Sequence, residues 1–79
     1  MAVRAYVLIQ TEVGRAGAVA AAVRDISGVD SSDDVTGPYD VIARATTDSI
    51  EELGRVVVTK IQLVQGITRT LTCPIVSLD

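Results

Sequence analysis

The chain has 79 residues, which is enough for one small domain with a limited core and too few for a second domain. It is 48% hydrophobic but only 3% aromatic, so the core must be built from Val, Ile, Leu and Ala. The formal net charge is −3 and the seven Lys and Arg residues are scattered singly, which argues against binding to a nucleic-acid backbone.

The first predicted elements are a strand and a helix. Residues 3–11 alternate between a fully apolar face and a half-apolar one, and the second face has Tyr6 and Leu8 at its centre. From Arg15 the apolar residues recur at helical spacing, and the alanines among them favour a helix. Gly28 stands where a left-handed C-terminal cap of this helix is expected.

The middle of the chain predicts two strands joined by a turn. The polar stretch over residues 29–35 is too short for a helix and predicts an edge strand, whose aspartates discourage pairing with other chains. Gly37 and Pro38 favour a turn, because Gly accepts a positive φ and Pro fixes its own φ at about −65°. Residues 39–45 then form a second, apolar strand.

The last part of the chain predicts a helix followed by a strand. Asp48 caps the helix in this prediction, and Glu51 reaches back to the cap. Gln65–Gly66 ends the helix, and residues 67–76 form a last strand rich in Thr and Ile. The expected buried stripe of the helix consists of Ile50, Leu53, Val57, Ile61 and Val64.

This order of elements predicts an α+β, ferredoxin-like βαββαβ fold, with a four-stranded antiparallel sheet and both helices on one face. We expect a single domain over residues 1–79. The uncovered face of the sheet would carry Tyr6, Leu8 and, depending on register, Ile42 or Leu71. An apolar patch of this kind usually marks a partner surface, and sheet-to-sheet homodimerisation would cover it.

The residue types available limit the possible chemistry. The sequence has no histidine, which removes the commonest general base and the commonest transition-metal ligand at neutral pH. Cys73 therefore has no histidine to activate it. The five aspartates between Arg24 and Arg44 match no calcium loop, and a solvated edge explains them better. We expect no catalytic residue, no metal site and no cofactor.

The sequence also bears on where the protein is found. No charged leader with an apolar core precedes the first strand, and no apolar run approaches the ~20 residues of a membrane-spanning helix. The single cysteine excludes an internal disulfide. These observations predict a cytoplasmic protein that does not associate with membranes.

The turn over residues 35–40 is the best-formed polar group in the chain, and it has two interpretations. As a structural corner, Tyr39 packs beside it and Asp40 accepts local N–H groups. As a ligand site, Gly37 lets a ligand approach the backbone, loop N–H groups bind a carboxylate, and Asp40 binds an ammonium group. A free amino acid carries both of these charges.

Three segments together carry a family resemblance: DDVTGPYDVIARA, a helix containing LGRVVVTKI, and GITRTLTCPIV. They resemble the effector-binding domain of the leucine-responsive (Lrp/AsnC) regulators. The family hallmark is a hydrophobic residue, a small polar residue, Gly, any two residues and Asp, which residues 35–40 match. The family's Gly-Val-x-x-Thr-x-Thr pattern is matched by Gly66, Ile67, Thr70 and Thr72, and the resemblance covers the whole chain.

The resemblance implies dimers joined through their sheets and rings of four dimers, which are octamers. It also implies a small-molecule site, typically for an amino acid, in the crevice between neighbouring dimers. One wall of the site would be formed by Gly37, Pro38, Tyr39 and Asp40. The other wall would come from the last strand, with Thr70, Thr72 and Cys73, and Asp34 would border the pocket.

Family regulators carry a helix-turn-helix domain ahead of this one, whereas this chain begins at its first strand. We expect a stand-alone form that binds no DNA by itself and modulates transcription of amino acid metabolism, with full-length relatives as further partners. Two alternatives remain open: a small dimeric ferredoxin-like enzyme of the monooxygenase or isomerase type, and a purely structural oligomer. The absence of His, Trp and Phe weakens the enzyme alternative.

Overall fold

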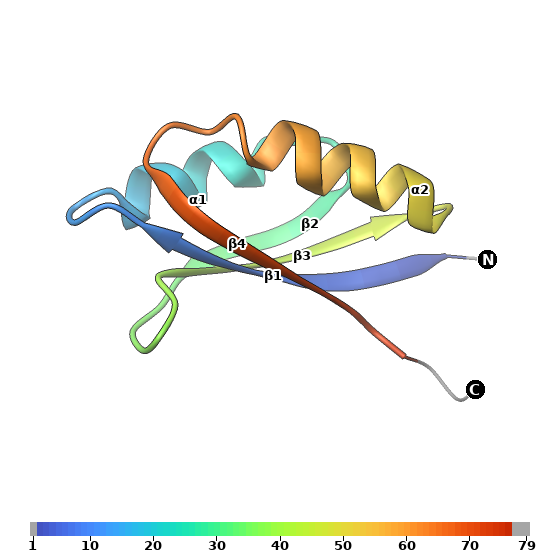
Figure 1. Cartoon of the computed structure of the whole chain (residues 1–79), viewed down its shortest axis with the longest axis horizontal. Helices are drawn as coiled ribbons and strands as arrows, with labels where there is room; N and C mark the ends of the chain where they lie inside the picture. The colour runs from blue at the N-terminus through green and yellow to red at the C-terminus, as the bar shows by residue number, and fades with distance from the viewer. Residues whose placement is uncertain (1, 77–79) are drawn as a thin grey trace.

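An antiparallel sheet carries two helical segments on one of its faces (Figure 1). The computed structural model describes residues 2–76, except for the side chains of residues 56–58. The elements in chain order are β1 (Val3–Thr11), α1 (Ala16–Arg24), β2 (Val29–Asp34), β3 (Val41–Thr47), α2 (Ile50–Leu53), the π-helix η1 (Gly54–Ile61) and β4 (Ile67–Pro74). This confirms the predicted ferredoxin-like fold.

The strands lie side by side in the order β2-β3-β1-β4, and each neighbouring pair is antiparallel. β1 is an inner strand, where Val7 pairs with Ala43 of β3 on one side and with Thr72 of β4 on the other. The acidic strand predicted over residues 29–35 is β2, and it does lie at an edge of the sheet.

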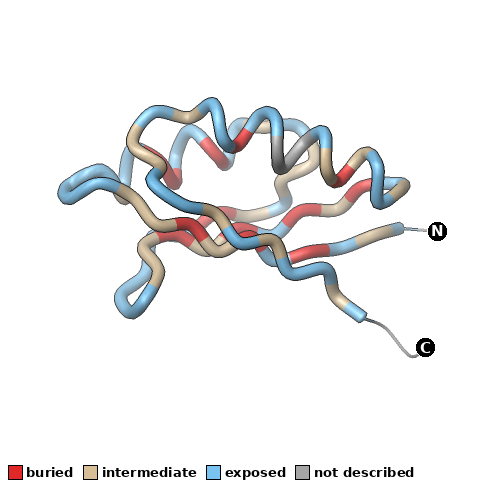
Figure 2. Tube along the Cα trace, in the orientation of Figure 1, coloured by how far each residue is buried: buried red, intermediate tan, exposed pale blue. Residues whose placement is uncertain are grey.

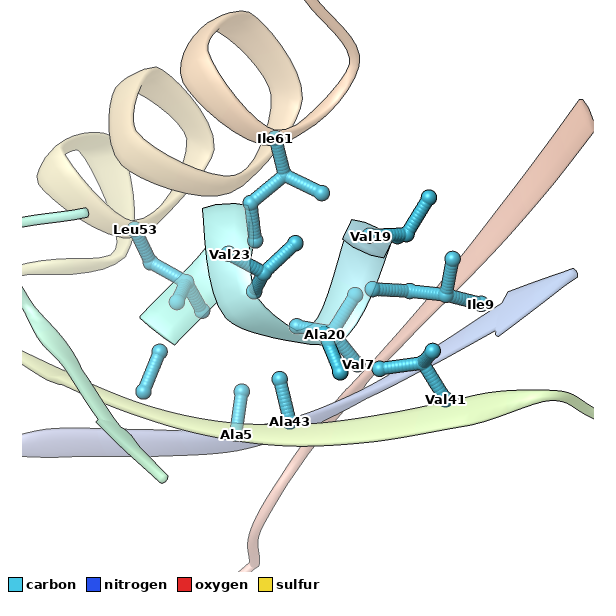
Figure 3. Close-up of a cluster of buried hydrophobic side chains, with 11 residues drawn as sticks. Ala5, Val7, Ile9, Val19, Ala20, Val23, Val41, Ala43, Leu53 and Ile61 are labelled. Carbon is cyan, nitrogen blue, oxygen red and sulfur yellow. The ribbon is translucent and has the colours of Figure 1, made fainter. Parts of the chain in front are cut away.

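The core lies between the sheet and the helical layer, where the buried residues gather (Figure 2). Alternate residues of β1 and β3 face the helices, because a strand with a period of two places them on one side. Their side chains and those of the helices point into a common space (Figure 3). The buried apolar residues are Ala5, Val7, Ile9, Val19, Ala20, Val23, Val41, Ala43, Ala45, Leu53 and Ile61.

The second helical segment corrects two of the predictions. Its N-cap is Ser49 instead of Asp48, and the Ser49 hydroxyl accepts the backbone N–H of Glu52 at 3.1 Å. Ile50 was expected in the buried stripe but is 58% exposed. The backbone changes to the π register at Gly54, so α-helical spacing does not apply to the later positions of the predicted stripe. The expected burial of Val57 lies outside the described side chains.

Both helical segments also end earlier than predicted. α1 ends at Arg24, and its C-cap is Asp25, so Gly28 is not the cap. Gly28 instead belongs to the turn into β2, where its carbonyl accepts the backbone N–H of Thr46 at 2.9 Å. η1 ends at Ile61, four residues before Gln65, and irregular backbone leads from there into β4. In each case the chain needs several residues outside the helix to turn back toward the sheet.

The opposite face of the sheet carries apolar side chains in one row. Leu8 pairs with Ile42 on one side and with Leu71 on the other, so both residues that the sequence left as alternatives lie on this face. Tyr6 lies in the next row, with the guanidinium of Arg44 5.9 Å from the centre of its ring. Tyr6 is 42% exposed and Leu71 is 41% exposed. We call Tyr6, Leu8, Ile42 and Leu71 the open-face patch.

Candidate functional site

The turn between β2 and β3 projects from one end of the sheet, on the side away from the helices (Figure 1). The backbone N–H of Val35 donates to the carbonyl of Asp40 at 2.8 Å and closes the base of the turn. Gly37 has a φ of 136°, which only glycine adopts without strain. No heavy atom lies within 4 Å of the position that a Cβ would take at Gly37. The backbone is therefore open to a ligand at this point.

Asp40 fastens the turn to the end of β1. Its backbone N–H donates to the carbonyl of Ile9 at 2.9 Å, and its Oδ2 accepts the backbone N–H of Thr11 at 2.8 Å. The side-chain amide of Gln10 donates to the carbonyl of Pro38 at 3.1 Å and adds a third contact. A carboxylate offers about four lone-pair positions, so the bond from Thr11 leaves Asp40 with further capacity to accept.

Gln10 and Thr11 were not among the predicted site residues, although they hold the turn in place. The bond between Thr11 and Asp40 joins residues 29 positions apart in the sequence. No sequence pattern around either residue indicates this bond. The carboxylate of Asp40 thus fastens a corner, but the prediction that it accepts local N–H groups is wrong, because the N–H that it accepts belongs to a different strand.

The residues expected for the second wall do not meet the turn within one chain. Thr70 and Thr72 pair with alternate residues of β1 that face the helices, whereas Cys73 pairs with Tyr6 on the open face and is exposed. β4 is separated from β3 and its turn by β1. Asp34 is exposed at the end of β2, next to the turn. The structure therefore groups Asp34 with the turn and leaves the β4 residues apart from it.

Two hollows lie elsewhere on the surface. One has a volume of about 210 Å³, contains the predicted residue Thr70, and lies where Gln62 donates to the Thr70 hydroxyl at 3.3 Å. The other has a volume of about 310 Å³ and lies between the α1–β2 turn and the second helical segment. The first is lined by Gln62, Ile67, Thr68, Arg69 and Thr70, and the second by Ser27, Gly28, Glu52, Arg55 and Lys60. Neither hollow includes the β2–β3 turn.

Across residues 2–76, no three or more His, Cys, Asp or Glu side chains gather closely enough to hold a metal ion. Within the same range, no helix combines the length and the apolar character needed to cross a membrane.

The sequence places the chain in a known family. Residues 4–77 match the family model of the Lrp/AsnC ligand binding domain, so the chain belongs to this family. A similar solved structure is TTHA0845 from Thermus thermophilus, with a TM-score of 0.90 and 32% identity over 98% of this chain and 96% of that one. The hypothetical protein PHS023 from Pyrococcus horikoshii has a TM-score of 0.86 and 27% identity over 95% and 90% of the two chains. A search of the curated proteins gave no match.

Longer regulators share the fold. AsnC of E. coli has a TM-score of 0.86 and 22% identity, and the match covers 95% of this chain but 51% of that one. The transcriptional regulator NMB0573 of Neisseria meningitidis, solved as a complex with L-Met, has a TM-score of 0.82 and 18% identity over 96% and 51% of the two chains. The chain therefore spans about half the length of these two proteins, and it is a ligand binding domain of the Lrp/AsnC family.

Proposed function

We propose that this domain binds an amino acid beside the turn over residues 35–40 and passes the signal on through its oligomeric assembly. The observation that supports this most directly is the combination of anchoring and openness in the turn. Asp40 and Gln10 hold it against β1, while the backbone at Gly37 is uncovered. A site that is rigid before the ligand arrives loses less conformational entropy on binding.

The two charges of an amino acid suit the two kinds of group in the turn. The ligand carboxylate accepts hydrogen bonds from backbone N–H groups of the turn, which Gly37 and Tyr39 carry and Pro38 lacks. The ligand ammonium pairs with the carboxylate of Asp40, whose orientation is set by the bond from Thr11. The complex of NMB0573 with L-Met supports an amino acid as the class of ligand.

A second chain is needed to complete the site in this proposal. β1 separates the turn from Thr70 and Thr72, and Cys73 lies on the other face of the sheet, so one chain supplies only one wall. We propose that two chains pair through the open-face patch and that dimers associate further, up to octamers, with the ligand between neighbouring dimers. Full-length relatives could join through the same surfaces, and the domain would act in regulation without catalysis and without contacting DNA itself.

A thermal-shift screen with the twenty amino acids tests the ligand class. A ligand that binds only the folded protein at 100 times its dissociation constant adds about 2.7 kcal/mol to the free energy of unfolding. We expect one amino acid, or a small group of similar ones, to raise the melting temperature. If none of the twenty does so, the purely structural oligomer becomes the better description.

Substitution of Asp40 tests the residue that carries the proposal. Asp40→Asn keeps an oxygen that accepts the Thr11 N–H but removes the charge, so the fold should survive. Losing one member of a charge pair in a partly desolvated site costs about 2 to 5 kcal/mol of affinity, so binding of the best amino acid should weaken at least tenfold in calorimetric titration. The matched control is Asp48→Asn, an exposed aspartate at the other end of β3, which should bind normally. Equal affinities for wild type and Asp40→Asn would remove Asp40 from the site.

A further inference from the structure

The hollow between the α1–β2 turn and the second helical segment brings together side chains of both charges. One wall carries Glu52 of α2 with Arg55 and Lys60 of η1, and the facing wall is formed by Ser27 and Gly28. The facing wall is held in place by the bond from the Thr46 N–H to the carbonyl of Gly28. The hollow has a volume of about 310 Å³. This is at the lower end of the range for small-molecule sites, which begins at about 300 Å³.

The π register of η1 explains why two cations share this wall. Arg55 and Lys60 are five residues apart. Five residues of an α-helix turn through about 500°, which would leave their side chains about 140° apart around the axis. A π-helix instead joins residues i and i+5 by backbone hydrogen bonds, so residues at this spacing lie one above the other.

The charges of this hollow are not neutralised by each other. Among the described residues, no ion pair within 4.0 Å links Glu52 to Arg55 or Lys60. The three side chains together carry a net charge of +1, from two cationic groups and one carboxylate. A ligand with negative charge only would be repelled by the carboxylate of Glu52. A ligand with positive charge only would be repelled by Arg55 and Lys60.

We propose that the hollow binds an acidic amino acid, aspartate or glutamate. Its two carboxylates pair with Arg55 and Lys60, its ammonium pairs with Glu52, and its net charge of −1 complements the hollow. The Ser27 hydroxyl can donate a further hydrogen bond to a carboxylate. The six residues of β2 separate Gly28 from the β2–β3 turn, a span of about 20 Å at about 3.3 Å per residue. This is therefore a second site, distinct from the one beside the turn.

Titrations with L-glutamate, L-aspartate and glutarate test the proposal. Glutarate has both carboxylates of glutamate but no ammonium, so the wild type should bind it more weakly than L-glutamate. Arg55→Gln and Lys60→Gln should each weaken L-glutamate about fivefold, a modest effect because the hollow is open to solvent. Glu52→Gln should weaken L-glutamate but leave glutarate unchanged or bound more tightly. The backbone amide of Gly28 serves as a local reporter of binding in NMR spectra. The three substitutions should not unfold the protein, because Glu52 is half-buried and Arg55 and Lys60 are exposed.

Two matched controls separate this site from the one beside the turn. Arg69→Gln removes the same charge from the other hollow, and Asp40→Asn removes a charge from the turn. Both should leave the Gly28 response to L-glutamate unchanged. The proposal is overturned if neither acidic amino acid perturbs Gly28, if glutarate binds the wild type as tightly as L-glutamate, or if Asp40→Asn abolishes the response while Arg55→Gln does not. Equal affinities of wild type and Asp40→Asn for the best ligand of the screen would remove the site beside the turn and would leave the Gly28 response to L-glutamate unaffected.

Discussion

Ser32 lies on the helix side of β2, where it is 1% exposed. Within the described part of the chain, its hydroxyl has no hydrogen-bond partner. Its carbonyl, by contrast, accepts a hydrogen bond from Nη2 of Arg24 at 2.6 Å, which ties α1 to the edge strand. A buried hydroxyl that makes no hydrogen bond has lost its contact with water without compensation. The oxygen of Ser32 therefore costs stability, while the backbone at the same residue contributes to it.

Removing this hydroxyl should stabilise the protein. We expect Ser32→Ala to raise the free energy of unfolding by up to about 1 kcal/mol in urea denaturation. The contrasting variant is Thr47→Val, because Thr47 is 4% exposed and its hydroxyl donates to the carbonyl of Ser49 at 2.8 Å. That change should lower the free energy by about 1 kcal/mol. A loss of stability in Ser32→Ala would mean that the hydroxyl does have a partner.

Alanine substitutions at two glycines with equally open surroundings should change the free energy of unfolding in opposite directions. Neither Gly37 nor Gly17 has a heavy atom within 4 Å of its Cβ position, so a methyl group fits at both. Gly37→Ala should lower the free energy of unfolding by about 1 to 3 kcal/mol, because alanine is strained at a φ of 136°. Gly17→Ala should raise it by up to about 1 kcal/mol, because Gly17 lies within α1. Thermal or urea unfolding measures both, and equal effects would refute the backbone explanation.

Among the elements, the second helical segment departs most from an ideal helix. It starts with one α-helical turn that is capped by Ser49, and it continues as eight residues of π-helix. Leu53 and Ile61 are buried, one from each part, and both belong to the core cluster. The segment is thus held to the sheet at two points, while its register between them is set by the packing instead of by α-helical hydrogen bonding.

The identity of the cap can be decided by two alanine substitutions. Ser49→Ala removes the acceptor of the Glu52 N–H and should lower the free energy of unfolding by about 1 kcal/mol. Asp48→Ala should have a smaller effect, because Asp48 is exposed and lies outside the cap position. Urea denaturation of the two variants side by side provides the measurement. A larger loss in Asp48→Ala would restore the cap that the sequence favoured.

At the scale of the whole molecule, the two faces of the sheet differ in what covers them. The helices cover one face, while the open-face patch on the other keeps Tyr6 and Leu71 about two-fifths exposed. Exposed apolar patches of this kind on small proteins commonly mark interaction sites. A domain of 79 residues also has a limited core, so a partner on this face would add buried apolar area that the single chain lacks.

A charge placed in the patch should therefore disrupt the proposed dimer. Leu71→Asp puts a carboxylate beside Leu8, where a second chain would bury it, and should convert dimers into monomers in sedimentation velocity. Ile50→Asp is the matched control, because Ile50 is even more exposed but lies on the helical layer. It should leave the assembly intact. A wild-type protein that is already a folded monomer at micromolar concentration would contradict the dimer and the proposed site between dimers.

The sequence by itself determined the order of the strands and helical segments. Strands and helices differ in the period of their apolar residues, and this local signal was clear in residues 3–11 and in the alanine-rich helix from Arg15. The turn at Gly37 was also visible locally, because few residues adopt its backbone conformation. Family membership followed from short motifs in a fixed order, which the family match confirmed.

Only the tertiary structure decided the relations between elements. The choice between Ile42 and Leu71 depended on strand register, and the structure placed both beside Leu8 because β1 pairs with two strands at once. The partner of Asp40 is 29 residues away, so no local pattern could reveal it. Arg55 and Lys60 lie on the same side of the helical segment only because η1 has the π register. Local propensities differ by less than about 1 kcal/mol per residue, so the packing of the whole domain decides such a register.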